Sequence, residues 1–178
     1  GTCKIGAAVI KNLSGFGCRI LASDIRENPS LKGLCTYVDN ETLYKACDII
    51  SLHMPLLDST RHFVNAETIA KMKDGVTIIN CARGELMNIP DMIRGIETQK
   101  IGALALDVFD KEDGIYHENR RDDIISNRDM AYLRQFPNVI MTQHMAFYTD
   151  AAVQSMVFCG IEGLCDFAKT GHTATELV

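Results

Sequence analysis

Six short apolar runs, rich in β-branched residues, alternate along this chain with stretches that have helical spacing. The runs are residues 18–23, 36–38, 48–52, 76–80, 101–106 and 138–141. Strands that alternate with helices form βαβ units, and such units build a parallel sheet. Several runs are apolar throughout, which is typical of strands covered by helices on both faces. The pattern therefore predicts an α/β fold with a parallel sheet.

Helices are expected in the intervening segments, at residues 4–16, 40–46, 65–73, 89–98 and 128–135. Asn40 is expected to cap the second of them, and Pro90 suits a first helical turn. After residue 149, apolar residues at three-and-four spacing predict a helix of about 20 residues, which Gly171 would end. Residues 110–127 follow neither period and predict a long, functional or mobile loop.

The first six residues, GTCKIG, differ at one position from the fingerprint GxGxxG of dinucleotide-binding folds. Gly1 would supply the tight turn, Cys3 would lie where the backbone approaches the pyrophosphate, and Gly6 would let a helix pack on the sheet. Asp24 follows the next strand at the spacing expected for an acid that binds the adenosine ribose, which favours NAD over NADP. A strand normally precedes the first glycine. We therefore expect a Rossmann-type doubly wound parallel sheet whose first strand is missing, in a piece of a longer protein.

Composition excludes several classes of protein. The 178 residues carry a net charge of -5, and Arg120–Arg121 is the only adjacent basic pair, so we expect no nucleic-acid partner. No apolar run approaches the roughly 18 to 20 residues of a membrane span, so we expect no membrane partner and a cytoplasmic location. The seven cysteines form no CxxC pair and have no histidine at zinc-ligand spacing, so no metal site is expected. We interpret them as reduced thiols, and all except Cys3 as small buried hydrophobes.

Four polar stretches follow predicted strands: SLHMP at 51–55, NCARGE at 80–85, LDVFDKE at 106–112 and MTQHMAFYT at 141–149. Open α/β sheets bind ligands at the carboxyl ends of their strands. The stretches present Arg83, Asp107, Glu112 and His144 at that edge. Each of these has an ordinary surface explanation alone, but their joint placement indicates an active site.

The order of these motifs resembles the NAD-dependent D-2-hydroxyacid dehydrogenases, most closely their D-lactate and D-2-hydroxyisocaproate branch. The resemblance implies an oxidoreductase that transfers a hydride between NADH and a 2-keto acid to give a D-2-hydroxy acid such as D-lactate. It further implies an NAD-binding domain at residues 1–148, a return helix and tail at 149–178 leading to an absent substrate domain, and a homodimer formed through the cofactor domain.

The resemblance also implies roles for particular residues. Arg83 matches the arginine that holds the substrate carboxylate, His144 the general acid, and Glu112 the acid paired with that histidine. Cofactor contacts are implied for Lys4, Ile5, Asp24, Met54, Pro55, Thr60, Cys81, Ala82 and Asp107, in addition to Gly1, Cys3 and Gly6 of the loop.

Two other functions stay open at this point. Transcriptional corepressors share this fold, sense dinucleotide and can retain the catalytic residues. A methyltransferase has a similar glycine loop and acid, but it gives no reason for the DVFDKE and TQH pair. Cys3 replaces a glycine and is expected to weaken NAD binding, and Gln143 stands where many relatives have a proline. Without a substrate domain, we expect the chain alone to turn over little or nothing.

Overall fold

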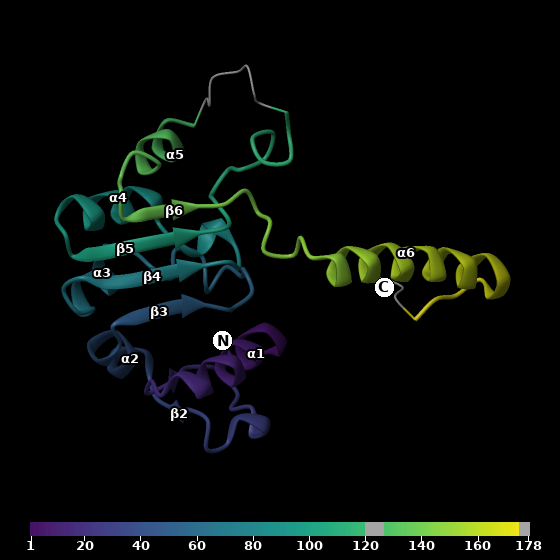
Figure 1. Cartoon of the computed structure of the whole chain (residues 1–178), viewed down its shortest axis with the longest axis horizontal. Helices are drawn as coiled ribbons and strands as arrows, with labels where there is room; N and C mark the ends of the chain where they lie inside the picture. Colours follow the sequence, from purple (N-terminus) through teal and green to yellow (C-terminus); the bar gives the residue numbers. More distant parts are fainter. Residues whose placement is uncertain (120–126, 175–178) are drawn as a thin grey trace. The chain divides into compact units, whose positions relative to one another are not determined.

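The computed structural model describes residues 1–119 and 127–174 of the chain. It divides into two compact units, Gly1–His144 and Met145–Val178. All strands of the described residues belong to the first unit (Figure 1). The pair Arg120–Arg121 and part of the predicted loop at 110–127 lie outside the described residues. The domain boundary expected after residue 148 stays a prediction.

All six predicted strands are present and every pairing is parallel. They are β1 (Leu21–Ala22), β2 (Thr36–Tyr37), β3 (Ile49–Leu52), β4 (Val76–Asn80), β5 (Ile101–Leu106) and β6 (Val139–Met141). They form a two-stranded sheet, β1-β2, and a four-stranded sheet, β3-β4-β5-β6. The predicted α/β class with parallel strands is confirmed. β1 is much shorter than the predicted run at 18–23.

Gly1 lies between the chain segments that leave the two sheets. Its nitrogen donates to the carbonyl of Ser23, directly after β1, at 3.0 Å. A Cβ on Gly1 would overlap the carbonyl oxygen of His53, directly after β3. A side chain therefore does not fit here, as the tight-turn role requires. That a strand leads into Gly1 stays a prediction.

The helices lie close to their predicted positions. They are α1 (Lys4–Leu13), α2 (Asn40–Ala46), α3 (Ala66–Lys71), α4 (Ile89–Glu97), α5 (Arg128–Leu133) and α6 (Asp150–Thr170). The expectation for Asn40 is wrong, because Asp39 is the N-cap and its carboxylate accepts the amide of Thr42 at 2.7 Å. Pro90 lies in the first turn of α4, and Gly171 ends α6 with a φ of 75°, both as predicted. A short 3-10 turn, η1 (Ser14–Phe16), continues α1 to the predicted helix end at residue 16, and two others, η2 (Pro29–Leu31) and η3 (Gly84–Leu86), were not predicted.

Only one face of the four-stranded sheet is fully buried. Ile50, Ile78 and Leu104 lie side by side on this face, in register, and belong to the main core cluster. On the other face Ile49 and Ile140 are 62% and 68% exposed. The expectation that these strands are covered on both faces is therefore wrong for the described residues. Their apolar sequence could not distinguish one covered face from two.

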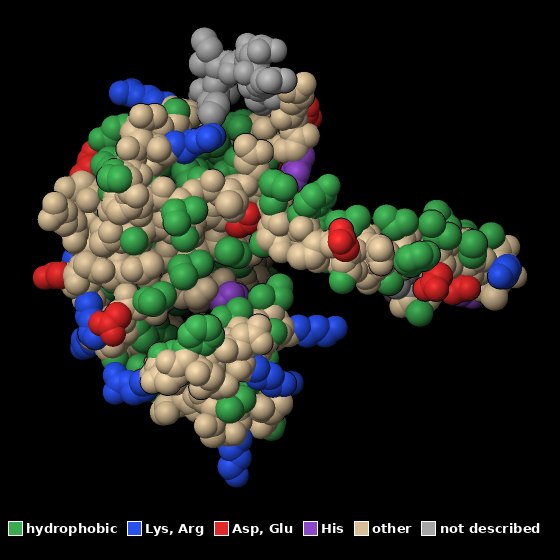
Figure 2. Space-filling view, in the orientation of Figure 1, with side chains coloured by type: hydrophobic (Ala, Val, Ile, Leu, Met, Phe, Trp, Pro, Cys, Tyr) green, Lys and Arg blue, Asp and Glu red, His purple; other side chains and the backbone are tan. Residues whose placement is uncertain are grey.

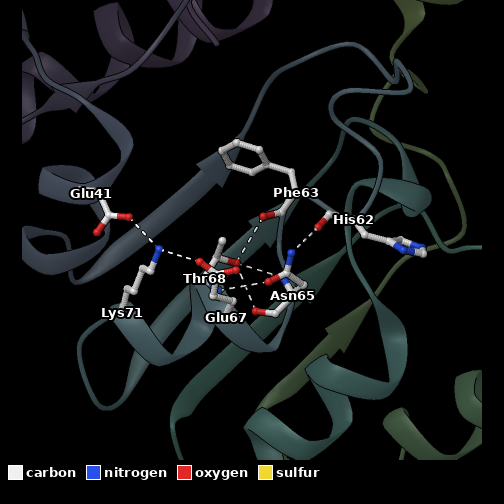
Figure 3. Close-up of polar contacts among 7 residues, drawn as sticks. All are labelled: Glu41, His62, Phe63, Asn65, Glu67, Thr68 and Lys71. Carbon is white, nitrogen blue, oxygen red and sulfur yellow. Dashed lines mark hydrogen bonds and ion pairs between the residues drawn. The ribbon is translucent and has the colours of Figure 1, made fainter.

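Polar contacts cap the start of α3 and connect its last residue with α2 (Figure 3). Asn65 and Thr68 form a capping box, in which each side chain bonds the other residue's amide at 3.0–3.1 Å. Lys71, one turn later, pairs with Glu67 at 2.9 Å and reaches Glu41 of α2 at 2.8 Å. The capping box stabilises the first turn of α3, and the exposed ion pairs of Lys71 link α3 to α2.

The second unit contains α6, whose large apolar side chains are exposed along its length (Figure 2). We expected no stretch long enough to span a membrane. α6 is 21 residues long and its most apolar window has a mean hydropathy of 1.2, enough by length and composition to cross a bilayer. This corrects the expectation about length. It is weak evidence for a membrane, because core helices of soluble proteins pass the same test.

The cysteines differ from the expectation of buried hydrophobes. All seven are free, and none is fully buried. Cys35 and Cys47 are half-buried, whereas the remainder are exposed: Cys3, Cys18, Cys81, Cys159 and Cys165. Cys35 and Cys47 pack against the two core clusters, whereas the interpretation as buried residues is wrong for Cys18, Cys81, Cys159 and Cys165.

Candidate active site

The first turn of α1 has the geometry expected of a phosphate-binding loop. The first intrahelical bond runs from the amide of Ala7 to the carbonyl of Cys3 at 2.8 Å, so the amides before Ala7 precede the helical ladder. Cys3 is the N-cap, and its side chain makes no capping bond. A Cβ on Gly6 would overlap the carbonyl of Gly1, so the helix starts directly against the glycine turn. These amides fit a pyrophosphate.

Cys3 itself does not need to be glycine for conformational reasons. Its φ is -66° and its ψ is -163°, which is extended backbone that any residue adopts. Its side chain is exposed, as are those of the cofactor candidates Lys4 and Ile5. The question about Cys3 is therefore one of clearance for the ligand and not of backbone strain.

Asp24 connects the end of β1 to this loop. Its Oδ2 accepts the amide of Thr2 at 2.5 Å and the Thr2 hydroxyl at 3.1 Å, and its Oδ1 accepts the amide of Arg26 at 3.1 Å. Burial opposes ionisation of this carboxyl, but the hydrogen bonds from Thr2 and Arg26 outweigh it and hold the pKa below its usual value. Asp24 is thus an anion with lone pairs left for ribose hydroxyls.

Thr2 was missed by sequence reasoning. It is only 3% exposed, and its hydroxyl also accepts the phenol of Tyr37 at 3.0 Å. Asn28 donates to its carbonyl at 3.0 Å. Thr2 occupies a variable position of the fingerprint, so no motif marks it. It joins the phosphate loop to the carboxylate of Asp24.

The loop after β3 holds Met54, Pro55 and Thr60. The Thr60 hydroxyl donates to the Pro55 carbonyl at 2.8 Å and accepts the amide of Leu57 at 2.8 Å. Met54 packs against the main core. The Thr60 hydroxyl therefore stabilises this loop by bonding two of its backbone groups. A cofactor contact by the same side chain would be a second role.

The loop after β4 contains Cys81, Ala82 and Arg83. The Arg83 guanidinium folds back and donates to the Ala82 carbonyl at 2.6 Å. Partial burial of the Cys81 thiol and the nearby carboxylate of Asp107 raise the pKa of that thiol. Cys81 therefore stays a neutral thiol, and Asp107 lies close to it.

Two contacts hold the loops after β4 and β5 together: a backbone hydrogen bond and the close approach of Gly84. The amide of Asp107 donates to the carbonyl of Asn80 at 3.0 Å. A Cβ on Gly84 would overlap the backbone of Phe109 and Asp110. The residue next to Arg83 is thus pressed against the segment that leads to Glu112.

Glu112 and His144 form a hydrogen-bonded pair. Glu112 Oε1 lies 2.5 Å from His144 Nδ1, and Glu112 Oε2 accepts the amide of Phe109 at 2.6 Å. The two side chains are 20% and 33% exposed, so water reaches the pair only in part. Because Nδ1 faces the carboxylate, Nε2 is the ring nitrogen left to meet another molecule.

The backbone of His144 is in an unusual conformation, with a φ of 53°. Its amide donates to the carbonyl of Asp107 at 2.6 Å, which helps to hold the residue there. Thr142 donates its hydroxyl to Asp107 Oδ1 at 2.5 Å. Asp107, Glu112 and His144 are therefore joined in one network, although β5 and β6 supply them separately.

Two further residues lie beside this pair and were not singled out from the sequence. Tyr116 is buried, and burial together with the charge of Glu112 raises its pKa to about 12. The ring of His117 lies 5.9 Å from that of His144, centroid to centroid. Both lie within the predicted loop at 110–127, where the absence of any period gave no signal.

The predicted residues form two groups. Asp24, Gly1, Cys3 and Gly6 surround the start of α1, and Arg83, Asp107, Glu112 and His144 lie on adjoining loops at the carboxyl ends of β4, β5 and β6. Within the described residues, no three His, Cys, Asp or Glu side chains are arranged to hold a metal ion. The arrangement provides an anion cradle, a guanidinium and a histidine that can transfer a proton.

Comparison with known proteins finds relatives along the whole chain. Residues 1–146 match the model of the NAD binding domain of D-isomer specific 2-hydroxyacid dehydrogenases. An aromatic 2-oxoacid reductase of Clostridium sporogenes is 43% identical over 179 residues, which cover 100% of this chain and 54% of the reductase. The chain spans about half the length of the curated relatives it matches.

Solved structures agree with the sequence match. A D-lactate dehydrogenase from Treponema pallidum has a TM-score of 0.94 at 34% identity, covering 100% of this chain and 54% of that protein. The NAD-complexed form of a D-isomer specific 2-hydroxyacid dehydrogenase from Lactobacillus delbrueckii ssp. bulgaricus has a TM-score of 0.90 at 31% identity, with 100% and 54% covered. Both alignments extend through α6.

Proposed function

Because this chain belongs to the D-isomer specific 2-hydroxyacid dehydrogenases, through their NAD-binding domain, we propose that the protein containing it reduces a 2-oxo acid to a D-2-hydroxy acid such as D-lactate. The observation that supports this most directly is the hydrogen bond between Glu112 and His144, on loops that adjoin that of Arg83. A sensor of NAD needs no proton donor held in this way. The family match removes the methyltransferase from consideration.

In the proposed reaction NAD supplies the hydride, and this chain supplies orientation and one proton. The guanidinium of Arg83 releases the Ala82 carbonyl and makes two parallel bonds to the substrate carboxylate. His144, protonated, donates from Nε2 to the keto oxygen as the carbon is reduced. Glu112 fixes the ring through Nδ1 and stabilises its positive charge. In the reverse direction the same histidine accepts the proton.

The cofactor candidates fit NAD in this scheme. The amides at the start of α1 would hold the pyrophosphate, and the carboxylate of Asp24 would accept hydrogen bonds from the ribose hydroxyls. A negative charge there repels the 2′-phosphate of NADP. Cys81, Ala82 and Asp107 follow β4 and β5 at the same sheet edge as His144, as residues near the nicotinamide should.

Three further parts of the proposal concern the whole protein. Its location is cytoplasmic, it forms a homodimer through the cofactor domain, and a substrate domain closes over the nicotinamide. The chain by itself is accordingly expected to bind NAD weakly and turn over little. Nucleic acid and membrane are not among the proposed partners.

Expression from the complete reading frame tests the function. NADH oxidation is followed with pyruvate, phenylpyruvate, 2-oxoisocaproate and 2-oxoglutarate, because relatives have both lactate and aromatic 2-oxoacid names. Chiral chromatography then identifies the product. We expect reduction of at least one acid to the D isomer. NAD binding without turnover of any acid would favour the corepressor-like sensor, which is the alternative function.

A further inference from the structure

We propose that Asn80 is a positioning residue that sets the place of Arg83 relative to His144, an inference that rests on the proposed function. Asn80 is the last residue of β4 and is 0% exposed. In register, its neighbours on the adjacent strands are Leu52 and Leu106, both in the apolar core. A buried amide is costly unless both of its ends are hydrogen-bonded.

Both ends of this amide bond to the Arg83 loop. Oδ1 accepts the amide of Ala82 at 2.9 Å, and Nδ2 donates to the carbonyl of Arg83 at 2.8 Å. The side chain thus spans the loop from inside, in the way a backbone turn would. Since β4 lies between β3 and β5, these two bonds fix the Arg83 loop to an inner strand of the sheet.

The backbone of the same residue reaches the proton donor. The Asn80 carbonyl accepts the amide of Asp107 at 3.0 Å, and the Asp107 carbonyl accepts the amide of His144 at 2.6 Å. One residue therefore connects the loop that holds the substrate carboxylate to the segment that presents the acid. A 2-oxo acid has a fixed distance between its carboxylate and keto oxygen, and a misplacement of about 1 Å costs on the order of 100-fold in rate.

The decisive variant is Asn80→Asp, which keeps the shape and the acceptor but removes the donor to Arg83. As a carboxylate it places an oxygen against the Arg83 carbonyl, whereas the protonated carboxyl can donate to it. Burial favours the protonated form. In the whole protein, the measured quantity is the kcat/KM of Asn80→Asp divided by that of wild type at the same pH. We expect this ratio to be lowered at least about tenfold at pH 8 and to return close to one at pH 6. A purely structural defect would give no such restoration.

A second comparison tests whether Asn80 acts through Arg83. Asn80→Ala should raise the KM for the 2-oxo acid at least about tenfold and the KM for NADH by a smaller factor, because Ala82, a cofactor candidate, is held by the same side chain. In an Arg83→Ala background the same change should cost less than about threefold, because the group it positions is gone. Additive losses in the double variant would overturn the proposal.

The control for stability is Asn88→Ala. Asn88 caps α4 by accepting the amide of Asp91 at 3.2 Å, so its loss destabilises the same domain away from Arg83. Its KM values should equal those of wild type. An equal rise in the KM for the 2-oxo acid in Asn88→Ala would mean that destabilisation alone produces the effect.

A readout independent of turnover uses the 178-residue chain. By NMR, the amide of Ala82 should exchange with solvent at least about tenfold faster in Asn80→Ala, with the helical amides of α4 unchanged. In Asn80→Asp the Gly84 amide signal, which belongs to the same peptide group as the Arg83 carbonyl, should titrate with the same midpoint as the activity ratio. If the wild-type protein reduces no 2-oxo acid, the proposed function fails. The exchange rate of the Ala82 amide then still tests whether Asn80 holds the Arg83 loop. Wild-type protection of Ala82 in Asn80→Ala would overturn the inference.

Discussion

Glu112 bonds Nδ1 of His144 at 2.5 Å, although 32 residues separate the two in the chain. The carboxylate is held in turn by the amide of Phe109, and the His144 backbone by the carbonyl of Asp107. Both ends of the pair are therefore anchored to the same short segment after β5. The pair is fixed before any substrate binds.

Replacing either partner should lower turnover more than cofactor binding. In the whole protein we expect His144→Gln to lower kcat by about 10²- to 10⁴-fold and Glu112→Gln by a smaller factor, since the ring remains. Steady-state kinetics with NADH and the best 2-oxo acid measure this. NAD affinity of both variants should stay within about twofold of wild type. Full activity of His144→Gln would remove it as the proton donor.

Asp24 should decide between the two nicotinamide cofactors. Asp24→Ala removes the acceptor for ribose hydroxyls and should weaken NAD binding about tenfold, while NADP binding improves. Calorimetric titration of the 178-residue chain measures both. Asp39→Ala, which removes only the α2 cap, is the control and should lower the stability of the domain slightly with NAD affinity unchanged. Equal losses for both cofactors in Asp24→Ala would contradict the assigned role.

Cys3→Gly should tighten NAD binding by a few-fold. The backbone of Cys3 is extended, so glycine is not required for conformation and the change mainly removes the CH₂SH group near the pyrophosphate. The same titration measures it, with Cys18→Gly, an exposed cysteine outside the loop, as control. Unchanged affinity would show that the thiol points away from the ligand.

Gly84→Ala should destabilise the domain and separate the loops that follow β4 and β5. The added Cβ overlaps the backbone of Phe109 and Asp110, which cannot move as a flexible side chain can, so we expect a loss of about 1–3 kcal/mol. Urea denaturation measures it. Gly15→Ala, where a Cβ meets nothing within 4 Å, should change stability by less than about 0.5 kcal/mol. Equal effects of the two substitutions would contradict the packing argument.

His53 should make the domain sensitive to mild acid. Burial lowers its pKa, and its Nε2 bonds the Ser51 hydroxyl at 2.9 Å. Because the folded pKa lies below the unfolded value, its contribution to stability is present above the unfolded pKa and is lost as pH falls through the folded one. His53→Gln should therefore show a smaller drop in urea midpoint between pH 7.5 and 5 than wild type. His172→Gln, at an exposed position, is the control, and an undiminished drop in His53→Gln would refute the prediction.

The predicted alternation of strands and helices was correct because it depends on local properties. Apolar runs such as β4 and β5, caps, and Gly171 at the end of α6 each act within a few residues of the chain. The family resemblance came from short motifs for the same reason. The prediction that Asn40 caps α2 was wrong, because the carboxylate of the preceding residue, Asp39, is the N-cap. The prediction that helices cover both faces of the sheet was wrong because an apolar side chain does not show which element packs on it.

The sequence by itself determined the class of fold, the phosphate loop and the candidates Asp24, Arg83, Glu112 and His144, because each follows a strand in a recognisable stretch. Only the tertiary structure decided which of them meet. Thr2 bonding Asp24 and Gly84 against Phe109 join segments that are distant in the chain, and the stretch that contains Asn80 and Arg83 does not reveal that the Asn80 amide bonds the loop from inside. Parallel strands bring their carboxyl ends to one edge of the sheet, which the sequence predicts. Which side chains touch at that edge depends on the packing of distant segments, and local spacing does not predict it.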